Sequence, residues 1–330
     1  MAEWRHTAAL LIALAALCPG YRGLAQAVEE EAQPGIAGIG TSGLSPDKAQ
    51  ALQRALDAQD YRGAESLLLP EIQSAQQPSY RYSLLLTIAG VYFLDHDDRN
   101  AAIAWKKAEA IKPLPQPLQF SLAMAYVGMG QRDWASRQLQ QLVAVDPKNA
   151  LYPYWLGRID YDRQAYASAI EHFQHAIQLD PGMARAYDNL GLCFSYLNQD
   201  AAAVRNFETA ISLDSHAKHP SPWPHINLAA MLQAEGDFTG AEKHLREAIR
   251  LDAKLAPTHF QLGNVLDGMG KPQAAVDEYK QAALLDAHYA EPHFALARLY
   301  HRLGQDDLSR REVRIYTQLH NTPSRTPAAP

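Results

Sequence analysis

The stretch YWLGRIDYDRQAYASAIEHFQHAIQLDP, residues 154–181, contains the sequence pattern from which the fold of the chain can be predicted. Apolar residues recur in it at steps of three and four, which places them on one face of a helix. The stretch is long enough for two such helices separated by a short polar turn, and Asp180-Pro181 ends the second because the residue before a proline avoids the helical region. It therefore predicts a helical hairpin that needs neighbours to cover its apolar face.

The same pattern recurs along the chain in steps of 34 residues, with a single step of 38. A small residue keeps this spacing, at Ala101, Ala135, Ala169, Ala203, Ala241 and Ala275. Four residues after each comes a bulky apolar one: Trp105, Leu139, Phe173, Phe207, Leu245 and Tyr279. An earlier pair in each unit joins an apolar residue to a small one: Ile88-Ala89, Leu122-Ala123, Leu156-Gly157, Leu190-Gly191, Leu228-Ala229 and Leu262-Gly263. Small residues let two helix backbones approach, and larger ones fill the space around the crossing.

This pattern resembles the tetratricopeptide repeat (TPR) family, most clearly in residues 150–183 and 184–217. The first of these units carries Trp155-Leu156-Gly157, Ala169, Phe173, Ala176 and Pro181. The second carries Leu190-Gly191, Phe194, Ala203, Phe207 and Ala210. The resemblance implies an all-α, right-handed superhelical solenoid of antiparallel helix hairpins, with about seven to eight repeats.

We predict that the solenoid covers residues 45–320, which leaves no stretch for a separate catalytic domain. Its units are 45–78, 82–115, 116–149, 150–183, 184–217, 222–255, 256–289 and a cap at 290–320. The first and last depart from the pattern, as end repeats do. Pro70 lies within the second helix of the first unit, and the last unit has Ser309 and Val313 at the small and bulky positions.

The N-terminal residues have the features of an export signal. Arg5 precedes an apolar run from residue 8 to 17, and the small-x-small pattern ending at Ala27 suits cleavage there. We expect residues 1–27 to be removed, with a lipid anchor on Cys18 as the alternative. The run is too short to span a bilayer, so we expect no membrane span in the mature chain. Residues 28–44 are predicted to be a flexible acidic and glycine-rich leader, and 321–330 a disordered tail.

Composition and charge argue against several classes of protein. Hydrophobic residues make up 47% of the chain, an ordinary globular value, and the net charge is −6 without any block of basic residues. Nothing in the sequence therefore indicates binding of nucleic acid. Two cysteines, Cys18 and Cys193, provide no disulfide framework. We expect no cofactor and no catalytic residue, because no phosphate loop, nucleophile elbow or metalloprotease motif is present.

The stretch SLDSHAKHPSPWPHINL, residues 212–228, interrupts the 34-residue spacing and contains three histidines and three prolines. His216 and His219 are three residues apart, which suits metal ligands on a helix, but the prolines oppose a continuous helix. We interpret the stretch as a proline-stiffened joint between repeats, with four inserted residues at 218–221 and solvent-exposed imidazoles. A metal-dependent enzyme using His216, His219 and His225 is the less favoured alternative.

The first helices of the units are expected to line a concave groove. By helical spacing, the following residues face it: Tyr154, Arg158 and Tyr161; Arg185, Asp188 and Asn189; Trp223 and Asn227; Phe260, Gln261 and Asn264. Asn189, Asn227 and Gln261 occupy the sixth position of successive units, and we call them the amide row. In TPR proteins an asparagine at this position often holds the backbone of an extended peptide, and the resemblance implies that role here. Simple tolerance of amides on a wet helix face is the alternative.

We therefore predict an exported, non-catalytic interaction module, periplasmic or secreted, that binds a peptide or protein segment in its groove as an adaptor or assembly factor. The structural alternative is an oligomeric scaffold that self-associates or joins an envelope complex through its convex face. Because TPR folds serve many partners, the sequence alone does not name the ligand.

Overall fold

The computed structural model describes residues 43–321, and all regular structure in this range is α-helical. The range divides into two compact units, 43–181 and 182–321. Helices of the first are α3 (Pro46–Asp57), α4 (Tyr61–Ser74), α5 (Pro78–Leu94), α6 (Asp98–Glu109), α7 (Gln116–Gly128), α8 (Arg132–Val145), α9 (Leu151–Asp162) and α10 (Tyr166–Leu179). Helices of the second are α11 (Ala184–Tyr196), α12 (Asp200–Asp214), α13 (Trp223–Glu235), α14 (Phe238–Leu251), α15 (Ala256–Gly268), α16 (Pro272–Leu285), α17 (Ala290–Arg302) and α18 (Asp306–Asn321).

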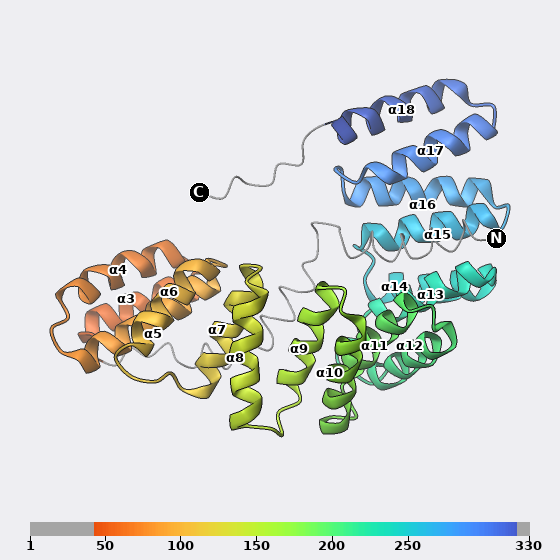
Figure 1. Ribbon diagram of the computed structural model, residues 1–330. Helices are drawn as coiled ribbons and strands as arrows, with labels where there is room; N and C mark the ends of the chain where they lie inside the picture. The colour runs from red at the N-terminus through yellow and green to blue at the C-terminus, as the bar shows by residue number, and fades with distance from the viewer. Residues whose placement is uncertain (1–42, 322–330) are drawn as a thin grey trace. The chain divides into compact units, whose positions relative to one another are not determined.

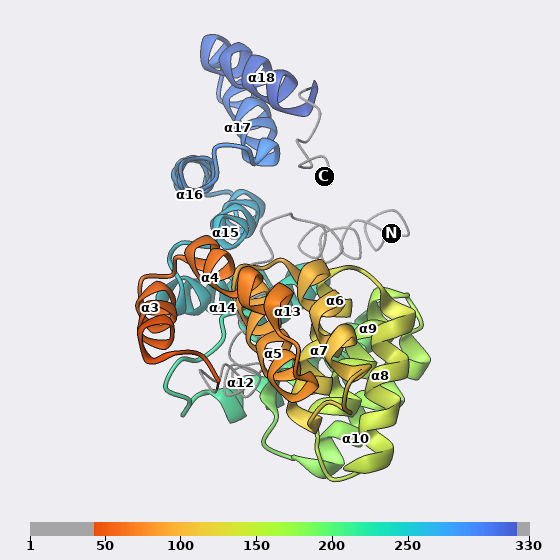
Figure 2. The ribbon, with the colours of Figure 1, turned by 90° about the vertical axis from the view of Figure 1, so that its left-hand side faces the viewer.

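Within each unit, the helices form successive antiparallel hairpins. Each helix packs on the next one along the chain, most extensively inside a hairpin such as α15/α16 and again between hairpins such as α14/α15. Both views of the molecule show this stacking for α15–α18 (Figures 1 and 2). The prediction of an all-α array of helix hairpins is confirmed.

Every hairpin turns at a residue with left-handed backbone geometry. These residues are Gln59, His96, Gly130, Gln164, Asn198, Gly236, Gly270 and Gly304, at the fifteenth position of the units. Glycine suits the conformation, while other residues adopt it at a cost. In three hairpins an aspartate follows the turn and accepts a hydrogen bond from a backbone N–H of the second helix, as Asp237 does from Gly240 at 2.9 Å.

The core of each complete repeat consists of the residues that kept the spacing of 34. The six small residues from Ala101 to Ala275 are fully buried, and the six bulky residues that follow them are at most 2% exposed. Within each unit, the chain thus forms one core layer per hairpin, and neighbouring hairpins of the same unit pack on one another. α18 ends the described chain differently, because none of its residues is buried and Val313 is 48% exposed at the bulky position.

The two helices of a hairpin cross closely at the eighth position of the unit. A Cβ atom on Gly191 would lie 2.6 Å from a ring carbon of Phe207, and one on Gly263 would lie 2.5 Å from the ring of Tyr279. These distances are shorter than real Cβ contacts, so a side chain there would displace the ring. Where the facing residue is Leu245, the eighth position is Ala229 instead.

Three further findings bear on function. Cys193 in α11 is fully buried and is not part of a disulfide bond. No helix within residues 43–321 combines the length and apolar character needed to cross a bilayer. The predicted signal at 1–27, the leader apart from its last two residues, and the tail beyond residue 321 lie outside the described residues.

Candidate peptide-binding surface

The predicted groove residues lie on the first helices of four hairpins. Tyr154, Arg158 and Tyr161 come from α9 in the unit 43–181. The other residues come from the unit 182–321: Arg185, Asp188 and Asn189 on α11, Trp223 and Asn227 on α13, and Phe260, Gln261 and Asn264 on α15.

Two members of the amide row hydrogen-bond within the unit 182–321. Asn227 donates from Nδ2 to Oδ1 of Asp188 at 2.8 Å, and both side chains are buried. This bond joins α13 to α11, across the joint that contains the four-residue insertion. Asn189 donates from Nδ2 to the carbonyl oxygen of Arg185 at 2.7 Å, one turn earlier in the same helix. The Asn227 bond therefore connects two helices of the array, whereas the Asn189 bond stays within α11.

Gln261 differs from the other two members of the amide row. It is only 8% exposed, yet among the residues that the structure describes its side chain makes no hydrogen bond. Its amide atoms are not among the fully buried polar atoms that lack a partner, so they remain open to solvent although the residue as a whole is mostly buried. Gln261 thus keeps a donor and an acceptor available on α15, at the position where the resemblance places peptide contacts.

The surroundings of Gln261 are aromatic and polar. Asn264, one turn further along α15, accepts a hydrogen bond through Oδ1 from the Tyr279 hydroxyl at 2.8 Å. Burial raises the pKa of Tyr279, so this hydroxyl remains a donor at neutral pH. The ring of Phe260 packs at 5.7 Å from that of Tyr279 and at 5.4 Å from that of Tyr289. These contacts fix the α15 face around Gln261.

In the unit 43–181, the predicted α9 residues differ in how accessible they are. Tyr154 is 5% exposed, with its ring 5.7 Å from that of Trp155 and 5.9 Å from that of Phe173. Arg158 is 8% exposed, while Tyr161 is half-buried against Tyr166. Packing between helices therefore accounts for Tyr154, and the α9 residues remain a prediction as ligand contacts.

The histidine-rich stretch, residues 212–228, was predicted to be a loop, but only its middle part is one, because α13 begins at Trp223. His216 and His219 are exposed in the connection between α12 and α13. His225, expected to be a solvent-exposed loop residue, instead lies half-buried in α13. The reason is that Pro224 stands in the first turn of α13, where the missing N–H is not needed. Across residues 43–321, no three His, Cys, Asp or Glu side chains are grouped so that they could hold a metal.

Sequence reasoning missed the partner of His225. Its Nδ1 atom lies 2.9 Å from Nδ1 of His244 on α14. The equivalent pairs in the next hairpins are His259–Glu278 and His293–Glu312. The signal was present, because His225, His259 and His293 are each 34 residues apart.

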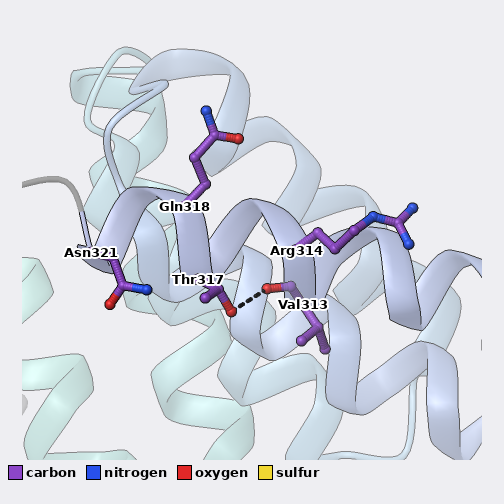
Figure 3. Close-up of a pocket in the computed structure, with 5 residues that line it drawn as sticks. All are labelled: Val313, Arg314, Thr317, Gln318 and Asn321. Atoms are coloured by element: carbon purple, nitrogen blue, oxygen red, sulfur yellow. Dashed lines mark hydrogen bonds between the residues drawn. The ribbon is translucent and has the colours of Figure 1, made fainter.

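A pocket on α18 does not coincide with the predicted groove. Its lining residues all come from that helix: Val313, Arg314, Thr317, Gln318 and Asn321 (Figure 3). Thr317 donates to the carbonyl oxygen of Val313 at 2.8 Å, a contact within the helix. The pocket is thus an exposed helix surface at the end of the described array, and it includes no member of the amide row.

Comparison with known proteins identifies the repeats. One family model described as tetratricopeptide repeat matches residues 120–184 and 260–319. A second model with the same description matches residues 184–216. The chain therefore carries tetratricopeptide repeats in both compact units. A solved tetratricopeptide repeat protein from Parabacteroides merdae has the same fold, with a TM-score of 0.60 and 15% identity over 81% of this chain and 98% of that one.

Two named relatives share part of the chain. BBSome complex member BBS4 of Xenopus tropicalis is 28% identical over 154 residues, which is 47% of this chain and 29% of the relative. Type IV pilus assembly protein PilF of Pseudomonas aeruginosa is 23% identical over 155 residues, 46% of this chain and 60% of PilF. The chain thus matches less than two thirds of each relative. The shared region supports the class of helical-repeat interaction module.

Proposed function

We propose that this protein is a non-catalytic adaptor or assembly factor that binds an extended peptide or protein segment along the first helices of the unit 182–321. The observation that carries the proposal is Gln261, a mostly buried residue on α15 whose amide stays open to solvent and makes no hydrogen bond within residues 43–321. One amide can hold a peptide unit through two hydrogen bonds regardless of sequence. The names of BBS4 and PilF, a complex member and an assembly protein, agree with this class of function.

The proposal assigns different roles to the three members of the amide row. Gln261 contacts the ligand directly, supported by Phe260 and Asn264 on the same helix. Asn227 and Asp188 hold α13 against α11 and thereby keep the groove in register. Replacing Asn227 by alanine would leave the Asp188 carboxylate without this hydrogen bond, so a loss of binding in that variant would not by itself identify a contact.

The test of groove binding is a crosslinking pull-down followed by an affinity measurement. The chain from Val28 onward captures its partner, and the affinity of that partner is then compared for Gln261→Ala and Gln273→Ala. We expect Gln261→Ala to weaken binding by about two- to tenfold, the contribution of one or two hydrogen bonds. Gln273 is exposed on α16, so its variant is the matched control and should bind like the parent chain.

A scaffold that acts through its second helices is the alternative, favoured by two large exposed side chains. Trp134 on α8 is 46% exposed, with its ring centroid 5.4 Å from that of Tyr126, and Ile103 on α6 is 44% exposed. Aromatic residues supply much of the energy at protein interfaces. If Trp134→Ala abolishes capture while Gln261→Ala and Gln273→Ala bind alike, groove binding is wrong and the scaffold replaces it.

We also propose that the chain is exported and processed after Ala27. The support is the sequence alone: the basic start at Arg5, the apolar run at 8–17 and the small-x-small pattern that ends at Ala27. In an export-competent host, N-terminal sequencing should find Val28 first. An Ala27→Arg variant should remain larger by the length of the signal. An N-terminus at an acylated Cys18 would show lipid anchoring instead, and an intact Met1 would contradict export by this signal.

A further inference from the structure

Three successive hairpins of the unit 182–321 carry a pair of side chains at one shared register. A histidine at the fourth position of the first helix faces a residue 19 positions later on the second helix, in the pairs His225–His244, His259–Glu278 and His293–Glu312. The histidine Nδ1 atom lies 2.9, 2.7 and 2.6 Å from its partner atom, respectively. Only the α13/α14 hairpin therefore pairs histidine with histidine, where its neighbours pair histidine with glutamate.

The two kinds of pair respond to acid in opposite ways. A neutral imidazole has one donor and one acceptor nitrogen, so His225 and His244 can share a single proton between their Nδ1 atoms. Once both rings are protonated, both Nδ1 atoms are donors, the hydrogen bond is lost, and two positive charges face each other. In α15/α16, by contrast, a protonated His259 donates to Glu278 and to the carbonyl oxygen of Ala253, which lies 3.2 Å from Nε2.

The groups around the histidine pair only partly compensate for these charges. Burial lowers the pKa of His225 and of His244, and the proximity of His244 lowers that of His225 further. Arg250 next to His225 and Lys243 next to His244 act in the same direction. The opposing acidic groups are Glu247 on α14, Asp237 at its start, and Glu208 on the packed helix α12.

One of these opposing acids is limited, and α15 adds no acidic group facing the pair. Glu247 is engaged by Arg250 through a hydrogen bond at 2.5 Å, which reduces what it offers the imidazoles. On α15, which packs against α14, the corresponding titratable group is His259, and Glu278 raises its pKa. The neighbouring hairpin therefore keeps the stabilising contribution of His259 over the pH range in which the histidine pair weakens.

From this register we propose that the His225–His244 pair is an acid-triggered switch that loosens the α13/α14 hairpin while α15/α16 stays closed. The switch does not depend on the proposed groove binding, because its readout is the hairpin itself. It would nevertheless affect the groove, since α13 carries Asn227 and its hydrogen bond to Asp188 of α11.

The direction of the effect follows from proton linkage. The opened hairpin takes up protons near the ordinary histidine pKa of 6.5, whereas the closed pair takes them up only at lower pH. Below pH 6.5, the equilibrium constant for opening the hairpin therefore increases by up to about tenfold for each pH unit when one proton is taken up. When two protons are taken up, the increase is up to about a hundredfold for each pH unit. For His259 the pKa is raised, so its stabilising contribution is present below pH 6.5 and is lost as the pH rises through the folded-state value.

Hydrogen exchange with mass spectrometry on the chain from Val28 onward tests the switch at pH 7.5 and pH 5, with rates corrected for chemical exchange. In the parent chain, we expect peptides of α13 and α14 to lose protection by at least tenfold at pH 5, relative to peptides of α15 and α16. His244→Glu gives this hairpin the pair of its neighbours and should abolish the loss. Glu278→His gives α15/α16 a histidine pair of its own and should make that hairpin acid-sensitive as well.

Two results would overturn the proposal. The first is equal protection of the α13/α14 peptides at both pH values in the parent chain. The second is an unchanged acid response in His244→Glu, which would place the sensitive group elsewhere. If His244→Glu does not fold, Glu278→His decides alone: peptides of α15 and α16 that remain protected at pH 5 in that variant would refute the switch.

Discussion

Phe207→Ala lowers the free energy of unfolding by about 3–5 kcal/mol, the largest effect expected from a single side chain in the unit 182–321. Phe207 is fully buried on α12, and its ring lies against Gly191 at the crossing with α11. Removing the ring loses its transfer free energy and leaves a cavity that a stacked layer closes only in part. Denaturant unfolding followed by circular dichroism measures the change.

A leucine on the same helix gives the matched control for this prediction. Leu213 is 38% exposed near the end of α12, so Leu213→Ala should change the free energy of unfolding by less than about 1 kcal/mol. Equal losses in the two variants would mean that the layer around Phe207 does not carry the stability assigned to it.

Gly191→Ala destabilises the unit by about 1–3 kcal/mol, although the same change in an ordinary helix adds stability. The added methyl group would stand 2.6 Å from the Phe207 ring, so the ring or the helix must move. The chain itself contains the compensating arrangement, because Ala229 at the equivalent position accompanies Leu245 instead of an aromatic residue. We therefore expect Phe207→Leu to relieve much of the effect of Gly191→Ala.

A double-mutant cycle measures this compensation. The free energies of unfolding of Gly191→Ala, Phe207→Leu and the double variant give the interaction between the two sites. A favourable interaction of about 1 kcal/mol or more is expected for residues in direct contact. Additive changes, or a Gly191→Ala variant as stable as the parent chain, would contradict the close crossing.

Most of the fold could be predicted because the core repeats itself. Ala203 and Phe207 have counterparts 34 residues away in the preceding repeat, and a periodic apolar pattern is the strongest local signal that a sequence contains. The last helix was harder to predict, since α18 keeps the helical pattern although none of its residues is buried within the part of the chain that the structure describes. Its length could be inferred, while the exposure of Val313 depends on what packs beyond it.

The site was less predictable, because helical spacing gives the direction of a side chain but not its partner. Asn227 and Gln261 occupy equivalent positions, yet only Asn227 meets an aspartate across the joint. For Tyr154, the same spacing cannot distinguish a groove-facing ring from one packed on Phe173. The contact between His225 and His244 joins two helices across a hairpin, and it depends on the register of their crossing.

The buried thiol of Cys193 gives the protein a native chemical reporter of its own opening. In a chain that begins at Val28, no other cysteine is present. A thiol reagent can reach this sulfur only when α11 separates from its neighbours, so the labelling rate measures transient exposure of a single core layer. Cys193 lies on the helix that receives the hydrogen bond from Asn227, which places the reporter directly beside the hairpin that carries the histidine pair. Ligand protection and acid opening can thus be followed in unmodified protein, without an introduced label.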